Sequence, residues 1–216
     1  MGVFKLTYIF YITNFKLCSF QKFVIIASLK RILDVLIVKG TNFDAEFIKN
    51  KEMNGDPRVY EVLRNLEIDF EYHEHPEAPT IEIAIQYWKD IKETTHCKNL
   101  FFRNHKGDKH YLVIMEHRQD LDIHDLEHRL KQGKLSFASE QRMEKYLGLK
   151  PGSVSPFGLV NDASHHVHLF LDENIRHLPR ISFHPNINTA SIVISFSDFE
   201  KYLKWTGNSY EYISMY

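Results

Sequence analysis

The sequence has few cysteines, little net charge and no long uninterrupted hydrophobic run. Its two cysteines, Cys18 and Cys97, are far apart in a chain of 216 residues and form no CxxC pair. A disulfide framework is therefore not expected, and a reducing, cytoplasmic environment is the default for such a chain. The formal net charge of -1 excludes the strongly basic composition of a general nucleic-acid binder, so no DNA partner is expected.

The first 52 residues differ in composition from the rest of the chain. They carry eight Lys and Arg against four Asp and Glu, set among aromatic and aliphatic residues. No uncharged run there reaches the roughly 18 residues of a membrane span, and no signal-peptide pattern is present. An amphipathic basic helix on a membrane surface is one interpretation. Another is that translation starts at Met53, because Asp56 and Pro57 are typical of a helix N-terminus that opens a domain.

From residue 53 onwards, helical and strand patterns alternate without an internal repeat. Apolar spacing and end signals predict helices over 56–66, from Thr80, and over 122–131, 139–147 and 197–205. Gly133 and Gly148 are expected to end the helices before them. Alternating and apolar runs predict strands at 70–73, 97–103, 110–115, 135–138, 166–171 and 191–195. The pattern predicts a single α/β domain over 53–216, with a mixed, mostly antiparallel sheet surrounded by helices.

A loop of unusual composition follows the predicted helix at 139–147. Residues 151–158 read Pro-Gly-Ser-Val-Ser-Pro-Phe-Gly, so that Gly152 and Pro156 stand four positions apart. Such a segment continues neither a helix nor an inner strand. It favours a rigid turn with free backbone N–H groups, which suit a carboxylate, a phosphate or a developing oxyanion. A plain surface turn has the same composition and remains the alternative.

Two further segments carry groups that suit a ligand. Lys98 and Asn99 open a predicted strand, where a lysine at the rim of the sheet would bind a phosphate. Arg103 lies at the other end of the same strand, and both cations could equally be solvated strand-end residues. His184 begins the polar loop Phe-His-Pro-Asn-Ile-Asn-Thr at 183–189 and is either a ligand contact or a turn residue.

The thirteen histidines of the chain raise the possibility of a metal site. His166 and His168 lie two apart on a predicted strand and face one side, and His184 could approach them to complete a zinc site. No HExxH motif, cysteine pair or spaced acidic ligand supports that arrangement, so no metal and no other cofactor is expected. Ser153 and Ser155 are candidate nucleophiles, but the sequence has no G-x-S-x-G elbow and no evident orienting acid.

A basic tract precedes the glycine loop. If its members shared a face, the loop would have a cationic approach suited to a polyanion, although a solvated helix face is the common explanation. The tract consists of His128, Arg129, Lys131, Lys134, Arg142, Lys145 and Lys150.

Four of these segments together resemble the stand-alone prolyl-tRNA deacylases of the YbaK-like superfamily. They are Lys-Asn-Leu-Phe at 98–101, Leu-x-Phe-Ala at 135–138, the loop from Gly152 to Asp162, and Phe-His-Pro-x-x-Asn-Thr at 183–189. These deacylases are similar to the editing domain inserted in bacterial prolyl-tRNA synthetases. The resemblance covers about residues 54–210, and residues 1–52 have no counterpart in it, which agrees with a start at Met53.

The resemblance implies a metal-independent hydrolase of mischarged tRNA(Pro), with alanyl-tRNA(Pro) as the expected substrate. It assigns Lys98 to the 3′-terminal nucleotide, the Gly152–Pro156 backbone to the ester carbonyl, and His184 to the aminoacyl pocket. Further substrate contacts are expected from Asn99, Arg103, Ser153, Val154, Ser155, Pro156 and Asn188. Arg103 departs from the lysine of many relatives, and the two cations bind phosphate differently.

The resemblance also implies partners. The expected one is the acceptor end of tRNA(Pro) carrying a wrong amino acid, and prolyl-tRNA synthetase is a second candidate. A non-catalytic module that holds aminoacyl-tRNA, or that associates with the synthetase, remains the alternative function. The presence of Lys98, the glycine loop and His184 favours the hydrolase.

Overall fold

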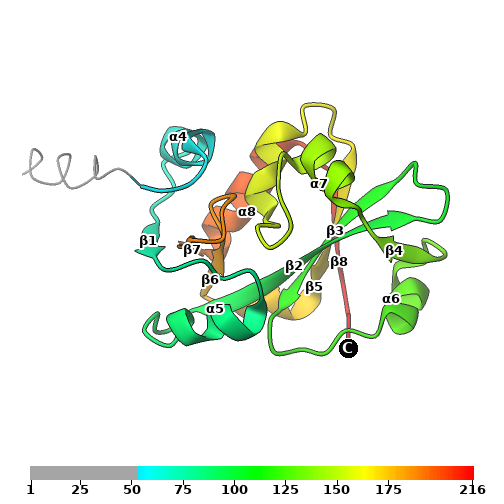
Figure 1. Ribbon diagram of the computed structural model, residues 1–216, viewed down its shortest axis with the longest axis horizontal. Coiled ribbons are helices and arrows are strands. Elements are labelled where there is room, and N and C mark those ends of the chain that lie inside the picture. The colour runs from blue at the N-terminus through cyan, green and yellow to red at the C-terminus, as the bar shows by residue number, and fades with distance from the viewer. Residues whose placement is uncertain (1–52) are drawn as a thin grey trace, which may run out of the picture. The chain divides into compact units, whose positions relative to one another are not determined.

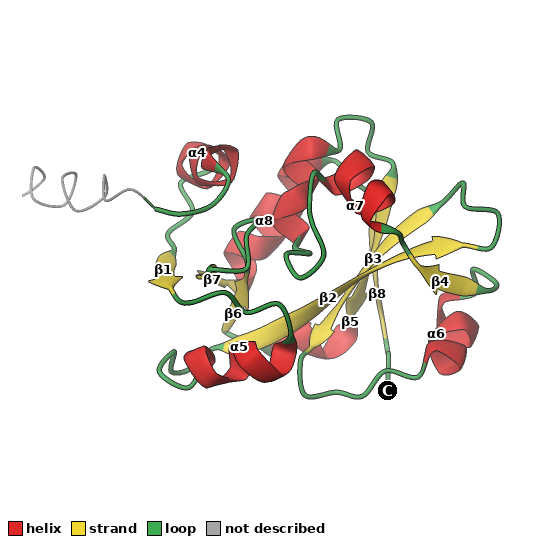
Figure 2. Ribbon diagram, in the orientation of Figure 1, coloured by secondary structure: helices red, strands yellow, loops and turns green. Residues whose placement is uncertain are grey.

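The computed structural model describes residues 53–216, and these form helices packed around one sheet (Figures 1 and 2). Residues 1–52, and with them both interpretations of that segment, lie outside the described part. The strands are β1 (Glu71–Glu74), β2 (Thr95–Asn104), β3 (His110–Glu116), β4 (Leu135–Phe137), β5 (Val167–Asp172), β6 (Arg180–Phe183), β7 (Ala190–Ser195) and β8 (Tyr210–Ile213). The helices are α4 (Pro57–Asn65), α5 (Ile81–Trp88), α6 (Ile123–Leu130), α7 (Glu140–Leu147) and α8 (Phe196–Thr206), with 3-10 turns η1 (Pro156–Asn161) and η2 (Glu173–His177).

The eight strands form one mixed sheet in the order β1-β7-β6-β2-β3-β5-β8, with β4 paired to β2. The pairs β1–β7, β6–β7, β2–β3 and β2–β4 are antiparallel, whereas β2–β6, β3–β5 and β5–β8 are parallel. The expected α/β class with a mixed, mostly antiparallel sheet is confirmed. The strands β6 (Arg-Ile-Ser-Phe) and β8 (Tyr-Glu-Tyr-Ile) were not predicted.

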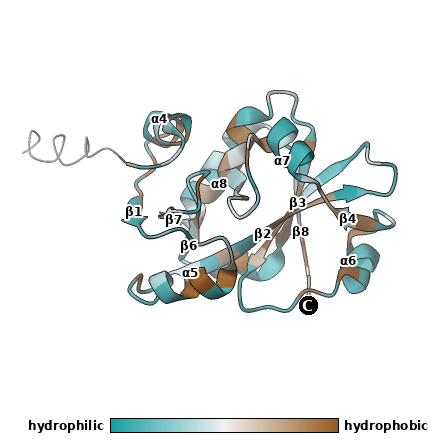
Figure 3. Ribbon diagram, viewed as in Figure 1, coloured by the Kyte–Doolittle hydropathy of each residue, from teal (hydrophilic) through white to brown (hydrophobic). Residues whose placement is uncertain are grey.

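Strand β3 lies at the centre of the core. Its residues His110 to Met115 are all buried, as the apolar run predicted. Phe102 of β2 and Phe170 of β5 pack with β3 and with Leu126 of α6 in one hydrophobic cluster. Figure 3 shows how hydropathy changes along the hairpin: the outer end of β2–β3 is hydrophilic, whereas the central strands carry apolar residues. None of the helices within residues 53–216 is long and apolar enough to cross a lipid bilayer.

The helix ends follow the local signals in the sequence. The Asp56 carboxylate accepts the N–H of Arg58 at the start of α4, as predicted. Gly148 ends α7 in the left-handed conformation, with φ of 65°. Helix α6 differs from the prediction, because Lys131 rather than Gly133 takes the left-handed position at its end.

Strand β2 has an open edge in its middle, and this gap positions the site. On the side away from β3, β2 pairs with β6 only at Thr95 and His96, and with β4 only from Phe102 to Asn104. The Phe101 carbonyl still accepts the N–H of Ala138 at 2.8 Å. Between these two partners, residues 97–100 have no neighbouring strand on that side.

Candidate active site

A cavity of about 200 Å³ opens at this gap and collects several of the predicted residues. Strand β2, the glycine loop, the His184 loop and the start of α5 form its walls. The predicted residues that line it are Lys98, Asn99, Gly152, Val154 and His184. The remaining wall consists of Ala78, Pro79, Thr80, Ile81, Ala84, Trp88, Cys97 and Leu100. Segments far apart in the sequence thus meet at one small, largely apolar hollow.

Gly152 is required by the shape of this loop. Its φ is +81°, a conformation that residues with a side chain rarely adopt. A Cβ at this position would lie 3.2 Å from both the Cα and the carbonyl oxygen of Pro79. The loop therefore packs backbone to backbone against the segment that leads into α5, and Gly152 and Val154 line the cavity beside it.

Some backbone N–H groups of the loop donate within the fold, and others have no partner there. The Ser153 N–H donates to the Lys150 carbonyl at 3.1 Å and is thereby occupied. Within residues 53–216, the N–H groups of Gly152, Val154 and Ser155 have no hydrogen-bond partner. Free donors close together in a turn can form a nest that stabilises an oxyanion. The oxyanion nest stays a prediction, and of these three residues Gly152 and Val154 line the cavity.

The rest of the loop holds the nest in place. The buried Ser155 hydroxyl accepts the N–H of Phe157 at 3.2 Å, so it caps η1. The Pro156 carbonyl accepts the hydroxyl of Tyr202 at 3.2 Å. Ser153 is also buried. Ser153, Ser155 and Pro156 therefore shape the loop, while Gly152 and Val154 line the cavity.

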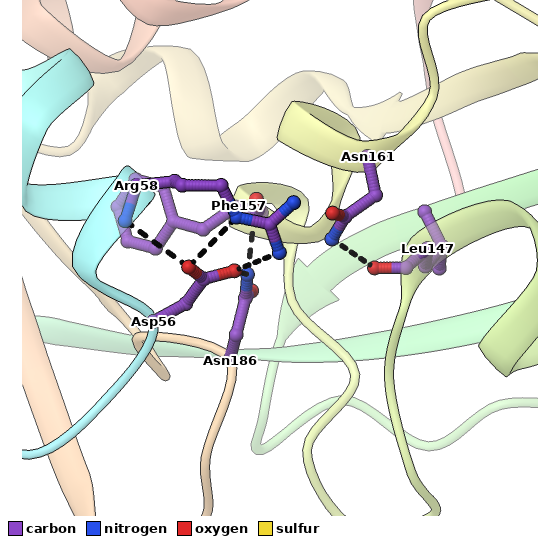
Figure 4. Close-up of polar contacts among 6 residues, drawn as sticks. All are labelled: Asp56, Arg58, Leu147, Phe157, Asn161 and Asn186. Carbon is purple, nitrogen blue, oxygen red and sulfur yellow. Dashed lines mark hydrogen bonds and ion pairs between the residues drawn. The ribbon is translucent and has the colours of Figure 1, made fainter.

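Two amides anchor the loop at its ends (Figure 4). Asn161 donates its Nδ2 to the Leu147 carbonyl at 2.7 Å, which ties η1 to the end of α7. Asn186 donates its Nδ2 to the Phe157 carbonyl at 3.4 Å and to Asp56 at 3.3 Å. The glycine loop lies between these anchors, so its position is fixed by α4, α7 and the His184 loop together.

Asn99 faces the cavity with both its side chain and its backbone. Its Nδ2 donates to the Val154 carbonyl at 3.1 Å, while its buried Oδ1 has no partner within residues 53–216. In an antiparallel pair alternate residues turn their N–H and C=O to the same side. The His96 carbonyl accepts the N–H of His117 on the β3 side, and the Phe101 carbonyl accepts the N–H of Ala138 on the β4 side. Asn99 is two residues from Phe101, so its N–H and C=O also point to the β4 side, into the gap.

Lys98 lies at the mouth of the cavity. Its ammonium group donates to the Gln119 carbonyl, and the residue is half-buried. Burial lowers the pKa of Lys98, and the nearby Asp120 carboxylate opposes that shift. Lys98 is the one lysine that lines this cavity.

His184 contributes a neutral imidazole. Its Nδ1 lies 2.8 Å from the Ala190 carbonyl, and because a carbonyl only accepts, Nδ1 carries the proton. Burial lowers the pKa of His184, and the adjacent His75 ring acts in the same direction. Its Nε2 is consequently an acceptor at neutral pH. The ring suits the wall of a binding pocket better than it suits an acid.

Two predicted residues lie apart from the cavity wall. Arg103 donates to the carbonyls of Asn104 and His105 at 3.0 and 3.2 Å, about 16 Å along β2 from Lys98. Asn188 donates to Glu77 at 3.1 Å and lies beside the glycine loop rather than in the cavity lining. Neither residue touches the hollow directly.

The histidines considered for a metal do not gather in one place. His166 bonds to His110 at 2.8 Å, and His168 bonds to Ser209 at 2.7 Å, in a different cavity from that of His184. Among residues 53–216 no group of three or more potential ligands is placed to hold a metal ion. The buried Ser155 hydroxyl caps η1, so it is not paired with His184 as a nucleophile would be.

The apolar wall from α5 was not identified from the sequence as part of a site. Ala84 and Trp88 are buried, and the indole N–H of Trp88 donates to Ser191 at 3.3 Å. Their helical spacing signals only a core-facing side. Which of the core-facing residues borders a hollow depends on the gap in the sheet, and no local pattern encodes that gap.

Comparisons with known proteins identify the family. Residues 75–202 match the family described as "Aminoacyl-tRNA editing domain". The chain therefore belongs to the aminoacyl-tRNA editing domain family, whose members are hydrolases of the ester bond in aminoacyl-tRNA. The matched span includes β2, the glycine loop and the His184 loop, so the family assignment covers the whole cavity.

Individual relatives carry names that refer to prolyl-tRNA or to prolyl-tRNA synthetase. The chain is 38% identical over 165 residues to the prolyl-tRNA editing protein ProX of Acetoanaerobium sticklandii, which covers 76% of this chain and 99% of that protein. It is 33% identical to the prolyl-tRNA synthetase associated domain-containing protein 1 of Mus musculus, over 68% of this chain and 88% of that protein.

Solved structures share the fold. A crystal structure of the hypothetical protein APE2540 aligns with a TM-score of 0.55 at 17% identity, over 72% of this chain and 97% of the other. A crystal structure described as a candidate trans-editing enzyme for prolyl tRNA synthetase aligns with a TM-score of 0.52 at 21% identity, over 74% of this chain and 98% of that one.

Proposed function

We propose that this protein is a trans-acting editing enzyme that hydrolyses mischarged tRNA(Pro), with alanyl-tRNA(Pro) as its preferred substrate. Residues 53–216 would form the editing domain. The observation that carries the proposal is the meeting of Gly152 and Val154, whose backbone N–H groups are free within residues 53–216, with Lys98 and His184 at one cavity. The relatives named for prolyl-tRNA editing support the choice of tRNA.

The free N–H groups of Gly152 and Val154 suit the carbonyl oxygen of the aminoacyl ester. Water attacks the carbonyl carbon, and the oxygen that becomes negative accepts hydrogen bonds from this nest. The bond from carbon to the ribose oxygen then breaks, that oxygen takes a proton, and free amino acid and tRNA leave. Donors fixed before the reaction stabilise the oxyanion without reorganisation, and losing one such donor costs about 10²–10³ in rate.

The other cavity groups suit the rest of the substrate. The Lys98 ammonium would bind a phosphate or ribose oxygen of the 3′-terminal nucleotide. The unpaired Oδ1, N–H and C=O of Asn99 add two acceptors and one donor beside it. The resemblance to prolyl-tRNA deacylases implies that a ribose hydroxyl of the substrate activates the water, so the protein need not supply a base.

Size selection would come from the apolar wall. A synthetase site built for proline cannot strongly reject a smaller amino acid, because missing methylenes cost only about 1–3 kcal/mol. Ala84, Trp88 and His184 border the cavity and would form the wall that the amino-acid side chain meets. We propose that alanine enters this pocket and that the proline ring is excluded from it.

The direct test measures deacylation of alanyl-, cysteinyl- and prolyl-tRNA(Pro) by the full chain, with EDTA present. Rapid loss of alanine with prolyl-tRNA(Pro) left intact is the expected result. The matched variant is Lys98→Ala, which should slow the reaction, with Lys89→Ala as a control outside the cavity lining. If none of the three esters is hydrolysed while the protein still binds tRNA, the non-catalytic module is the correct function. If only cysteinyl-tRNA(Pro) is hydrolysed, cysteine takes the place of alanine as the preferred aminoacyl group.

We further propose that the partner is the acceptor end of tRNA(Pro), presented free or by prolyl-tRNA synthetase. Co-sedimentation of the protein with the synthetase, with and without tRNA(Pro), tests the second route. A complex that forms only with tRNA would show that the tRNA bridges the two proteins. No complex in either condition would leave free tRNA as the substrate.

A further inference from the structure

We infer that the tip of the β2–β3 hairpin, together with Phe137, is a second RNA-binding surface that receives the acceptor end outside the cavity. We call it the hairpin-tip surface and define it by Lys106, Lys109, Lys134 and Phe137. The inference rests on the proposed function, since it names the part of the substrate that lies beyond the terminal nucleotide. Figure 1 shows the hairpin projecting past β4, away from α5.

The tip is held rigidly. The Asn104 Oδ1 accepts the backbone N–H groups of Gly107, Asp108 and Lys109 at 2.9, 3.1 and 3.2 Å. Arg142 of α7 donates to the Gly107 carbonyl at 2.7 Å, which clamps the turn to the body of the domain. A turn fixed from inside and outside presents its side chains in a constant arrangement, so little ordering is needed when a ligand binds.

The tip carries an excess of positive charge. Lys106, Lys109 and Lys134 are exposed and line one hollow of about 320 Å³. None of the three ammonium groups lies within salt-bridge distance of a carboxylate in residues 53–216. Asp108 is the one acidic residue in that lining, so the hollow keeps a net positive charge. Such a site attracts the phosphates of a nucleic acid.

Phe137 adds an aromatic surface between the cavity and the lysines. Its side chain is 53% exposed, which is unusual for a large apolar residue. Its ring stacks on the buried Phe102 with centroids 4.6 Å apart, so the ring has a fixed orientation. An exposed ring beside cations is a stacking platform for an unpaired base. A protein-docking surface would present several apolar residues together, whereas the other large exposed apolar residues within 53–216 lie on α5, on α8 and at Tyr216.

The spacing along β2 fits the end of a tRNA. Phe137 pairs in register with Phe102, about 10 Å along the strand from Asn99. Lys106 is seven residues from Asn99, or about 23 Å if the strand geometry continued into the turn. The four unpaired nucleotides at a tRNA 3′ end cover about 14 Å when stacked at 3.4 Å each. Phe137 therefore lies within reach of the unpaired bases, and the lysines lie where the duplex phosphates begin.

The test compares two substrates that differ only beyond the terminal nucleoside: alanyl-tRNA(Pro) and the 3′-alanyl ester of adenosine. The variants are Phe137→Ala and the triple variant Lys106→Glu, Lys109→Glu, Lys134→Glu. Trp205→Ala and Lys204→Glu on α8 are the matched controls, because Trp205 is similarly exposed at 46%. Thermal unfolding of each variant establishes that it is folded.

We expect Phe137→Ala to lower kcat/KM on the tRNA about 10-fold, as for the loss of one stacked base. The triple variant should reduce the slope of log affinity against log salt by about 2.7, as for the loss of three contacts to duplex phosphates. Both should hydrolyse the adenosine ester as the wild type does. Equal losses on both substrates, or no loss on either, would overturn the inference.

Binding of uncharged tRNA(Pro), followed by fluorescence anisotropy, separates this inference from the proposed function. If the wild type hydrolyses neither ester, the proposed function fails, and the anisotropy arm still decides about the surface. Weaker tRNA binding by both variants would support the surface, and unchanged binding would refute it. Unchanged RNA binding with lost binding to prolyl-tRNA synthetase would reassign the surface to a protein partner.

Discussion

The substitution Gly152→Ala tests the oxyanion nest most directly, because the backbone donors themselves cannot be mutated. Gly152 has a φ of +81°, where a residue with a Cβ is strained by roughly 1–2 kcal/mol. The added methyl would also lie 3.2 Å from the Pro79 backbone, so the loop must shift by a few tenths of an ångström. A domain stable by about 5–15 kcal/mol tolerates this and remains folded.

The catalytic effect should be far larger than the effect on stability. A nest that moves away from the ester oxygen weakens hydrogen bonds made in the transition state, and one such donor is worth about 10²–10³ in rate. Single-turnover deacylation of alanyl-tRNA(Pro), with enzyme in excess, measures the chemical step without the contribution of product release. We expect a rate at least about 10² below that of the wild type.

Gly133→Ala is the matched control. Gly133 has a similar φ of +74°, but a Cβ there has nothing within 4 Å, and the residue lies outside the site cavity. It should therefore lose a similar amount of stability and keep its single-turnover rate. If Gly152→Ala is folded, is destabilised no more than Gly133→Ala and reacts at the wild-type rate, the glycine loop is not the oxyanion site.

Three further predictions concern the groups around the loop. Burial lowers the pKa of Lys98, so substrate affinity should fall at an alkaline pH below the ordinary lysine pKa of 10.5. Lys98→Arg should abolish that fall. If the pH profile of affinity is the same in Lys98→Arg as in the wild type, Lys98 does not bind the substrate. Burial, with His166 and Arg142 nearby, lowers the pKa of His110 to about 4. Between pH 6.5 and 4 the unfolded chain therefore binds more protons than the folded one, so the free energy of unfolding should decrease as the pH falls through that range. His110→Gln should flatten this decrease when stability is measured by urea unfolding. An equally steep dependence of stability on pH in the variant would contradict the prediction. Asn161→Ala removes the hydrogen bond to the Leu147 carbonyl and should lower the free energy of unfolding by about 1 kcal/mol. It should also lower kcat with little change in KM. A change in KM alone would show that Asn161 acts in substrate binding instead.

Local signals accounted for most of the elements. Asp56 and Gly148 take the cap positions that their chemistry favours, and the apolar run of β3 became the buried centre of the sheet. Strands β6 and β8 were not predicted, although β1 and β4 are equally short or shorter and were. Lys131 ended α6 before Gly133 could, which shows that a glycine near a helix end need not be its cap.

The sequence by itself determined the residue types of the site. A glycine in a rigid turn, a lysine at the start of a strand and an imidazole in a polar loop are all visible in the chain, and their order carries the family resemblance. Chemistry that depends on one residue and its immediate neighbours is encoded locally, so these features could be identified before the fold was known.

Only the tertiary structure decided which of these groups act together. The gap between β6 and β4 is a property of three strands, and it turns the backbone of Asn99 into the cavity. Folding left Arg103 some 16 Å away along the same strand, and it occupied the Ser153 N–H with a carbonyl while leaving the N–H of Gly152 free. Contacts between segments separated by more than fifty residues arise from packing, and no pattern within a single segment records them.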